Sequence, residues 1–221
     1  MTSARADLSR VVALVPIRGL ERAKARLGEA LDAEERLLLT ERLLRRTIVA
    51  AATAPGVALV AVISPDRAAL GFARAHGAAA LEETGSDLNA ALDEGRQWAR
   101  TIAATALLVL PADLPAIDAD AVAAVLARAR AAIGPASAAD DRPVVALVAD
   151  RAGTGTNALL LSPPGAIAFA FGPGSRAAHA AAARRAGAHY LELGGPLSLD
   201  LDMPDDLLLA GDPVRPPPCD R

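Results

Sequence analysis

Short runs of apolar residues alternate along this chain with longer stretches in which apolar and polar positions recur with helical spacing. Continuous apolar runs of roughly four to eight residues between turn residues are typical of strands that are buried on both faces of a sheet. We therefore predict strands over residues 11–15, 57–63, 78–82, 106–110, 144–149, 158–161, 189–193 and 197–201.

The amphipathic stretches between these runs predict helices, several of which follow a residue that can cap the first turn. Helices are expected over residues 33–53, 67–76, 88–103, 119–132 and 204–209, and a short one after Ser175, with Asp32, Asp87 and Asp118 as caps. Because strands alternate with helices of roughly ten or more residues, right-handed crossovers and a mostly parallel mixed sheet are expected. In such a sheet, ligands bind beyond the carboxyl ends of the strands.

Composition narrows the class of protein. The length of 221 residues suits one domain, placed at residues 1–210 and followed by a proline-rich tail at 211–221. A formal net charge of −3 gives no general attraction to nucleic acid or to an anionic membrane, so phosphate chemistry would need local cations or a metal. The single cysteine, Cys219, excludes an internal disulfide and suits a reducing cytoplasm.

Targeting signals are not evident in the sequence. Residues 1–10 lack an apolar secretory core, and the longest uncharged stretch, residues 152–175, is broken by glycines and prolines. We therefore expect no membrane span and a cytoplasmic protein. The oligomeric state stays open, with a homodimer among the alternatives.

Lys24 is the single lysine among 23 basic residues, and it lies in the loop after the first predicted strand. A position that stays lysine in an arginine-rich chain suggests a need for a compact ammonium rather than a planar guanidinium. Arg18 and Arg26 flank it, and spaced cations at this place could neutralise a triphosphate. The alternative is a solvated basic stretch, and this loop alone does not decide between the two.

Three aspartates lie in loops that suit metal ligation. Asp113 stands between two prolines after a central strand, which would hold its carboxylate on the ligand side of the sheet. An extended segment would put Asp200 and Asp202 on one side, close enough to share a hard cation such as Mg²⁺. Asp202 could instead cap the helix that begins near Pro204, but that role leaves Asp200 unexplained.

Two glycine-rich segments, residues 153–157 and 171–176, offer backbone amides and hydroxyl groups to an anion. Glycine-rich turns also occur in hairpins, and Ser175 could simply be the N-cap of the next helix. His179 could contact the ligand or pack in the core, and the sequence does not decide between these roles.

Taken in order, these segments resemble the CofC/FbiD guanylyltransferases of deazaflavin coenzyme F420 biosynthesis, over about residues 12–209. The resemblance rests on VPIR at 15–18, AKARL at 23–27, DLNAA at 87–91, PADLP at 111–115, GTN at 155–157, FGPGS at 171–175 and DLD at 200–202. Each motif alone is weak, but the whole series in one order argues against a chance match.

This resemblance implies a nucleotide-diphospho-sugar transferase-like (Rossmann-like) three-layer α/β sandwich. It also implies transfer of GMP from GTP to a small phosphorylated carboxylic acid, with release of pyrophosphate and with Mg²⁺ as the cofactor. In bacterial members the acid is typically phosphoenolpyruvate, whereas relatives use 2-phospho-L-lactate or 3-phospho-D-glycerate. The product would pass to a downstream deazaflavin transferase.

Residue roles follow from the resemblance position by position. They are Lys24, Arg26 and Asp113 for catalysis; Pro16, Arg18, Lys24 and Asn89 for the nucleotide; Thr156, Asn157, Gly172 and Ser175 for the acceptor; and Asp113, Asp200 and Asp202 for Mg²⁺. The mycobacterial type carries threonine where this chain has Asn157, so the choice among the three acids stays open.

Two other functions are weighed against this one. A nucleotidyltransferase acting on a sugar phosphate or a molybdopterin-type cofactor would usually carry a glycine-rich loop after the first strand, and residues 16–20 lack it. A non-catalytic nucleotide-binding subunit would have no need to retain all three aspartates.

Overall fold

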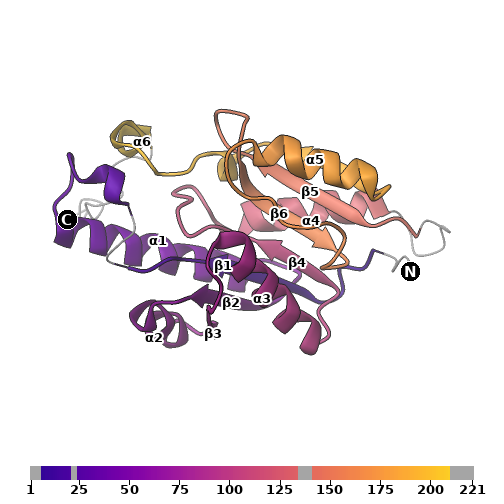
Figure 1. Cartoon of the computed structure of the whole chain (residues 1–221), viewed down its shortest axis with the longest axis horizontal. Coiled ribbons are helices and arrows are strands. Elements are labelled where there is room, and N and C mark those ends of the chain that lie inside the picture. Colours follow the sequence, from indigo (N-terminus) through magenta and orange to yellow (C-terminus); the bar gives the residue numbers. More distant parts are fainter. Residues whose placement is uncertain (1–5, 21–23, 134–140, 210–221) are drawn as a thin grey trace, which may run out of the picture.

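The core of the protein is a mixed β-sheet. The computed structural model describes residues 6–20, 24–133 and 141–209, and within them the strands form a seven-stranded sheet in the order β3-β2-β1-β4-β6-β5-β7 (Figure 1). The strands are β1 (Val11–Pro16), β2 (Val57–Ser64), β3 (Ala79–Glu82), β4 (Ala106–Val109), β5 (Val144–Ala149), β6 (Thr156–Ser162) and β7 (His189–Leu193). Neighbouring strands are parallel except where β6 meets β4 and β5, which confirms the predicted mostly parallel mixed sheet.

β6 runs against its neighbours because a tight loop joins it to β5. In that loop the Asp150 N–H donates to the Gly155 carbonyl oxygen at 3.3 Å, and the Thr154 N–H donates to Asp150 Oδ1 at 2.7 Å. The reversal places Thr156, the first residue of β6, at the edge of the sheet where β1 and β4 end.

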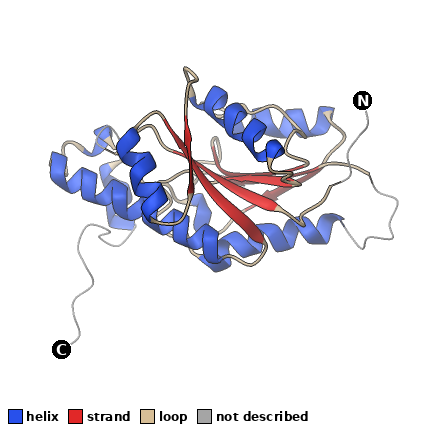
Figure 2. Ribbon diagram, turned by 90° about the horizontal axis from the view of Figure 1, so that it is seen from below, coloured by secondary structure: helices blue, strands red, loops and turns tan. Residues whose placement is uncertain are grey.

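Helices cover both faces of the sheet, which gives the three layers that were expected (Figure 2). The helices are α1 (Ala33–Thr53), α2 (Arg67–Ala75), α3 (Leu88–Thr101), α4 (Ala119–Ile133), α5 (Ser175–Arg185) and α6 (Pro204–Leu209), with 3-10 turns η1 (Ala25–Leu27) and η2 (Pro196–Ser198). Helices α1, α2 and α4 pack on one face, and α3 and α5 pack on the other.

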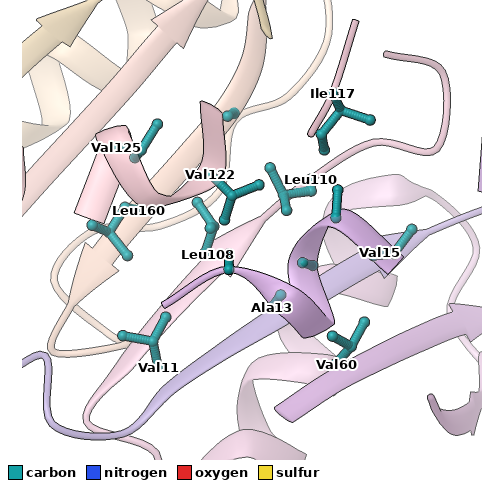
Figure 3. Packing of buried hydrophobic residues seen from close by; sticks show 14 of the residues in the cluster. Val11, Ala13, Val15, Val60, Leu108, Leu110, Ile117, Val122, Val125 and Leu160 are labelled. Carbon is teal, nitrogen blue, oxygen red and sulfur yellow. The ribbon is translucent and has the colours of Figure 1, made fainter. Parts of the chain in front are cut away.

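Alternation along β1 shows how a continuous apolar strand serves both layers. Val11, Ala13 and Val15 point into the layer of α1 and α4, where Figure 3 shows them beside residues of β4. Val12 and Leu14 belong to the opposite core, with α3. A strand that is buried on both faces therefore needs no polar positions, as the sequence of β1 shows.

Side-chain caps define the helix starts that the sequence predicted. Asp32 accepts a hydrogen bond from the Glu35 N–H, and the Glu35 carboxylate accepts one from the Asp32 N–H, which makes a capping box at the start of α1. Asp87 caps α3 through the Asn89 N–H, and Asp118 caps α4 through the Ala121 N–H. These three predictions are confirmed.

One local prediction is wrong, and one alternative role is excluded. Residues 197–201 form no strand, because Gly195 at a φ of 126° and Pro196, which has no N–H to donate, lead into the turn η2 instead. Ser175 is not an N-cap: it is the first residue of α5, and the cap is Gly174, at a φ of 73° and without a side-chain bond. A left-handed cap requires glycine more than it requires a hydroxyl group.

Neither a membrane-spanning helix nor the proline-rich tail is found among the described residues. No helix of the described residues has the length and apolar character that crossing a membrane requires. Residues 134–140, after α4, lie outside the described residues. The tail at 211–221, with Cys219, also lies outside them.

Candidate active site

A cleft of about 350 Å³ opens where β1 and β4 end. The residues that line it include Pro16, Arg18, Lys24, Glu83, Asp113 and Asp202. They come from loops after β1, β3 and β4 and from the segment before α6, and the sheet gathers them because the carboxyl ends of parallel strands meet at one edge. This is the ligand position that the topology predicted.

The loop after β1 is fixed to the neighbouring strand and helix. The Ile17 N–H donates to the Ile63 carbonyl oxygen at 3.0 Å, so the loop continues beside β2. The Leu20 N–H donates to Asp66 Oδ2 at 3.0 Å, while Asp66 Oδ1 accepts from the Ala68 N–H and caps α2. One aspartate thus anchors both this loop and the next helix.

Lys24 bridges two aspartates in the cleft. Its Nζ donates to Asp113 Oδ2 at 3.1 Å and to Asp202 Oδ1 at 3.2 Å, and the side chain is 7% exposed. Its backbone has a φ of 60°, a left-handed conformation that costs a non-glycine residue roughly 1–2 kcal/mol. The two ion pairs hold the ammonium at the centre of the cleft despite that cost.

The segment before α6 lies beside Asp113 through backbone contacts. The Leu201 N–H donates to the Asp113 carbonyl oxygen at 3.0 Å. Asp206 Oδ2 accepts from the N–H groups of Asp202 and Met203, at 3.0 and 2.8 Å. Arg151 reaches Asp206 Oδ1 at 3.0 Å, which ties this segment to the loop after β5. The aspartates are therefore juxtaposed without any strand in the segment.

Asp200 brings a third carboxylate to the site. Burial and then the negative charge of Asp113 raise its pKa, while the Asn157 amide, 3.4 Å from Oδ1, acts in the opposite direction. Arg26 lies 3.8 Å from Asp202 but is 73% exposed, so it neutralises little. Within the described residues, no group of three His, Cys, Asp or Glu side chains is arranged to hold a metal ion by itself.

The hydroxyl group of Thr156 contacts the ring of a buried histidine, His179. His179 Nε2 accepts from the Ala170 N–H at 3.0 Å, which assigns the proton to Nδ1, and Nδ1 lies 3.1 Å from Thr156 Oγ1. The Phe171 ring meets the imidazole edge-on, with 5.0 Å between centroids. Burial lowers the pKa of His179 to about 4, so the ring is neutral and positions Thr156.

The glycine-rich loop before α5 is tied to α3 by Asn89. Its Nδ2 donates to the Phe171 carbonyl oxygen at 3.0 Å, and its Oδ1 accepts from the Phe171 N–H at 2.8 Å. Gly172 and Gly174 have φ angles of 129° and 73°, with open space where a Cβ would stand. The Ser175 N–H donates to the Gly172 carbonyl oxygen at 3.1 Å and closes the loop.

A family comparison bears directly on this site. The sequence model of the family described as "Guanylyl transferase CofC like" matches residues 11–210. The chain belongs to the CofC-like guanylyl transferase family. The match contains all of the strands and helices that build the cleft, and it confirms the resemblance drawn from the motifs.

Relatives within the CofC-like family align over most of the chain. A phosphoenolpyruvate guanylyltransferase of Rubrobacter xylanophilus is 46% identical over 198 residues, which cover 89% of this chain and 91% of that protein. One of Sphaerobacter thermophilus is 41% identical over 197 residues, with 89% and 90% covered.

Solved structures show the same fold at low sequence identity. A protein of Desulfovibrio desulfuricans G20, assigned as a nucleotide-diphospho-sugar transferase, has a TM-score of 0.67 at 16% identity, over 87% of this chain and 82% of that chain. A 4-diphosphocytidyl-2C-methyl-D-erythritol synthase has a TM-score of 0.58 at 17% identity, over 91% and 97%. The expected nucleotide-diphospho-sugar transferase-like fold is thereby confirmed.

The residues singled out from the CofC-like motifs form two groups in the structure. The first group lines or adjoins the cleft and consists of Pro16, Arg18, Lys24, Arg26, Asp113, Asp200 and Asp202. The second group surrounds the two glycine-rich loops and consists of Asn89, Thr156, Asn157, Gly172 and Ser175. Asn157 joins the groups through Asp200, and the functional role of each residue stays a prediction.

Two residues of the site were missed by sequence reasoning. Glu83, directly after β3, lines the cleft with a side chain that is 4% exposed. Asp206 lies in the helix expected over residues 204–209 and was not among the candidate site residues, but it holds the backbone of Asp202. Glu83 could have been found in the sequence, because a glutamate next to the end of a predicted strand is a candidate ligand-binding residue. No sequence signal indicated the contact of Asp206 with Arg151.

Proposed function

We propose that the chain transfers GMP from GTP to phosphoenolpyruvate, giving enolpyruvoyl-2-diphospho-5′-guanosine and diphosphate in coenzyme F420 biosynthesis. The observation that carries this proposal is the buried Lys24 ammonium between Asp113 and Asp202, at the edge of the sheet where nucleotides bind. The relatives named phosphoenolpyruvate guanylyltransferase, at 46% and 41% identity, support this acceptor over 2-phospho-L-lactate and 3-phospho-D-glycerate.

In the proposed reaction, an oxygen of the acceptor's phosphate attacks the α-phosphorus of GTP in line. The bond from that phosphorus to the oxygen that bridges to the β-phosphate breaks, and pyrophosphate leaves with its electron pair. A phosphate monoester is largely ionised near neutral pH, since its second pKa is about 6, so no protein base has to remove a proton. Catalysis then rests on positioning and on charge stabilisation.

Lys24 is the residue that we assign to the charge of the triphosphate. Its ammonium is already buried at the cleft and paired with two carboxylates. When GTP binds, we expect it to exchange one carboxylate for phosphate oxygens, because the ammonium then stays paired in both states. Arg26, which is largely exposed and lies in the same loop, would add a second cation at the rim.

The carboxylates of the cleft suit an Mg²⁺ ion whose remaining ligands are substrate phosphates and water. Asp113, Asp200 and Asp202 would supply the oxygen ligands that Mg²⁺ prefers. Asp113 and Asp202 pair with Lys24 and the charge of Asp113 acts on Asp200, so the three carboxylates leave negative charge to be neutralised. When bound, Mg²⁺ would supply Lewis-acid stabilisation of the α-phosphate and of the departing pyrophosphate. Asn157 would orient Asp200 for this role.

The acceptor would bind against the two glycine-rich loops. Thr156 is held by His179, and the space beside Gly172 and Gly174 leaves their backbone open to an approaching anion. Ser175 begins α5, whose N-terminal amides favour negative charge. Together these features support a phosphate- or carboxylate-binding pocket next to Asp200. The same proposal includes hand-over of the reaction product to a deazaflavin transferase.

The deciding experiment supplies GTP and Mg²⁺ with each of the three acids and measures pyrophosphate release. A downstream deazaflavin-accepting transferase is included to trap a labile product. Phosphoenolpyruvate should turn over faster than the other acids by on the order of tenfold or more. Faster turnover of another acid would reassign the acceptor, and GTP binding without pyrophosphate release on any acid would show a non-catalytic nucleotide-binding subunit.

A further inference from the structure

Glu83 carries a buried carboxylate oxygen that no hydrogen bond satisfies. Among the described residues, Glu83 Oε1 and Thr47 Oγ1 are the buried side-chain oxygens without a hydrogen-bonding partner, and only Glu83 lies at the cleft. Arg18 Nη1 is 3.9 Å from Oε1, too far for a hydrogen bond, and its side chain is 59% exposed. A buried carboxylate oxygen without a donor is unfavourable unless a ligand supplies one.

The backbone holds this carboxylate at the cleft. The Glu83 N–H donates to the Ser64 carbonyl oxygen at 3.0 Å, so the residue continues the pairing of β2 and β3 beyond the last strand residue. Burial raises the pKa of Glu83, while the Arg18 charge acts in the opposite direction. The residue is thus anchored through its backbone, and its desolvated side chain lines the same cleft as the apolar side chains of Ile17 and Leu88.

Glu83 and Asp113 follow strands that are well separated in the sheet. β3 and β4 are three strand positions apart in the sheet. With a spacing of about 4.8 Å between strands, their ends are separated by on the order of 14 Å. An extended nucleotide whose phosphates lie near Lys24 and Asp113 would therefore direct its base towards Glu83, between the apolar side chains.

We propose that Glu83 binds the Watson–Crick edge of guanine and makes the nucleotide site selective for GTP. Guanine presents two adjacent donors on this edge, the N1–H and the 2-amino group, and a carboxylate presents two acceptors. Adenine presents a lone pair at N1, which would face a carboxylate oxygen and be repelled. The inference rests on the proposed nucleotidyl transfer in this cleft and assigns the residue that selects the base.

The test compares GTP, ITP and ATP as donors to phosphoenolpyruvate in wild type and in Glu83→Gln. Glutamine keeps the size of the side chain but offers one acceptor and one donor, so it can pair with N1 and the 6-amino group of adenine but cannot accept from both the N1–H and the 2-amino group of guanine. The variant should lower kcat/KM for GTP by on the order of a hundredfold, because a hydrogen bond to a charged group is lost and a donor faces a donor. The ratio of GTP to ATP turnover should fall further, since ATP turnover rises.

ITP, which lacks the 2-amino group, separates base reading from a general defect. In wild type it should be a poorer substrate than GTP, and in Glu83→Gln the difference between ITP and GTP should shrink. Glu82→Gln is the matched control, because Glu82 is exposed on the neighbouring position of β3, and it should leave all three ratios unchanged. Calorimetric binding of GTP and ATP gives the same comparison without turnover.

The possible results separate the base assignment from the proposed function. Wild type that releases no pyrophosphate with any nucleotide or acid would overturn the function itself. Active wild type with an unchanged GTP to ATP ratio in Glu83→Gln would overturn the base assignment alone. An equal loss of kcat/KM with GTP, ITP and ATP would also overturn the base assignment. Glu83 would then have a structural role beside Arg18.

Discussion

At the residue scale, the candidate site is built around a cation that is shared by distant carboxylates. Lys24 meets Asp113, which follows β4, and Asp202, which precedes α6, within 3.2 Å of each. An ammonium donates in several directions from one atom, whereas a guanidinium is planar and larger. The Lys24 side chain is only 7% exposed. The smaller size of the ammonium and its several donor directions therefore explain why an arginine-rich chain keeps a lysine at this position.

Lys24→Ala should lower kcat/KM for pyrophosphate release by roughly 10² to 10³, because a preorganised charge at the reacting phosphates is lost. Lys24→Arg should recover little of this rate, since the guanidinium cannot replace the ammonium between two aspartates. Arg45→Ala, on the exposed side of α1, is the control and should keep the wild-type rate. Activity of Lys24→Ala within a few-fold of wild type would exclude the proposed role.

His179 should make the stability of the protein depend on pH. Its folded-state pKa of about 4 lies below the ordinary value of 6.5, so the unfolded chain binds the proton more tightly. The neutral His179 contributes fully to the free energy of unfolding above pH 6.5, and this contribution is lost as the pH falls towards 4. The free energy of unfolding should therefore drop by about 2 kcal/mol between pH 7 and pH 5. Urea unfolding should show this drop in wild type and not in His179→Gln; equal drops would contradict the assignment.

At the scale of elements, Asn89 joins the start of α3 to the loop before α5. Both polar atoms of its amide bind the backbone of Phe171, so the described conformation uses Asn89 to position the loop. The family resemblance instead implies a nucleotide contact for this residue. The two roles differ in which substrate loses affinity when the side chain is removed.

Asn89→Ala should raise KM for phosphoenolpyruvate by about tenfold, the loss expected for roughly 1.5 kcal/mol of hydrogen bonding to the acceptor loop. KM for GTP should change much less. Asn89→Asp keeps the acceptor for the Phe171 N–H but loses the donor, so it should lie between wild type and Asn89→Ala. A rise in KM for GTP alone would assign Asn89 to the nucleotide.

At the scale of the whole molecule, the protein has two main hydrophobic cores and a small third cluster, which lies near the cleft. Leu27, Leu39, Leu43 and Leu201 form this minor cluster, separate from the cores on the two faces of the sheet. It supports the 3-10 turn that follows Lys24 and the segment that carries Asp202. The end of the cleft that we propose for metal and phosphates therefore depends on few apolar contacts, and we expect it to open before the sheet does.

Leu201→Ala should leave a cavity in the minor cluster and speed amide hydrogen exchange over residues 24–31 and 200–207. Exchange in β1 and β4 should stay near wild type, and turnover should fall because the aspartates lose their fixed position. Leu160→Ala is the matched control in a main core, where Leu160 is fully buried, and should lower the free energy of unfolding of the whole protein by about 2–5 kcal/mol, and its Tm accordingly. Equal effects of both changes on β1 and β4 would show a single cooperative core.

Much of the fold could be read from the sequence because its signals are local. Apolar runs located seven of the eight predicted strands, and aspartate caps located the starts of α1, α3 and α4. The exception, residues 197–201, contains an alternating pattern that two glycines and a proline override. Family motifs also pointed to the loops that carry the candidate site.

The sequence by itself determined the alternation of elements, the capped helices and the membership of a guanylyl transferase family. Tertiary structure alone decided which side chains meet. Lys24 and Asp202 are 178 positions apart, Asn89 meets Phe171 rather than open space, and Glu83 acquires a buried oxygen without a hydrogen-bonding partner only when β3 joins β2. The physical reason is that periodicity and capping act within a few residues, whereas burial and ion pairing depend on the packing of segments that are distant in the chain.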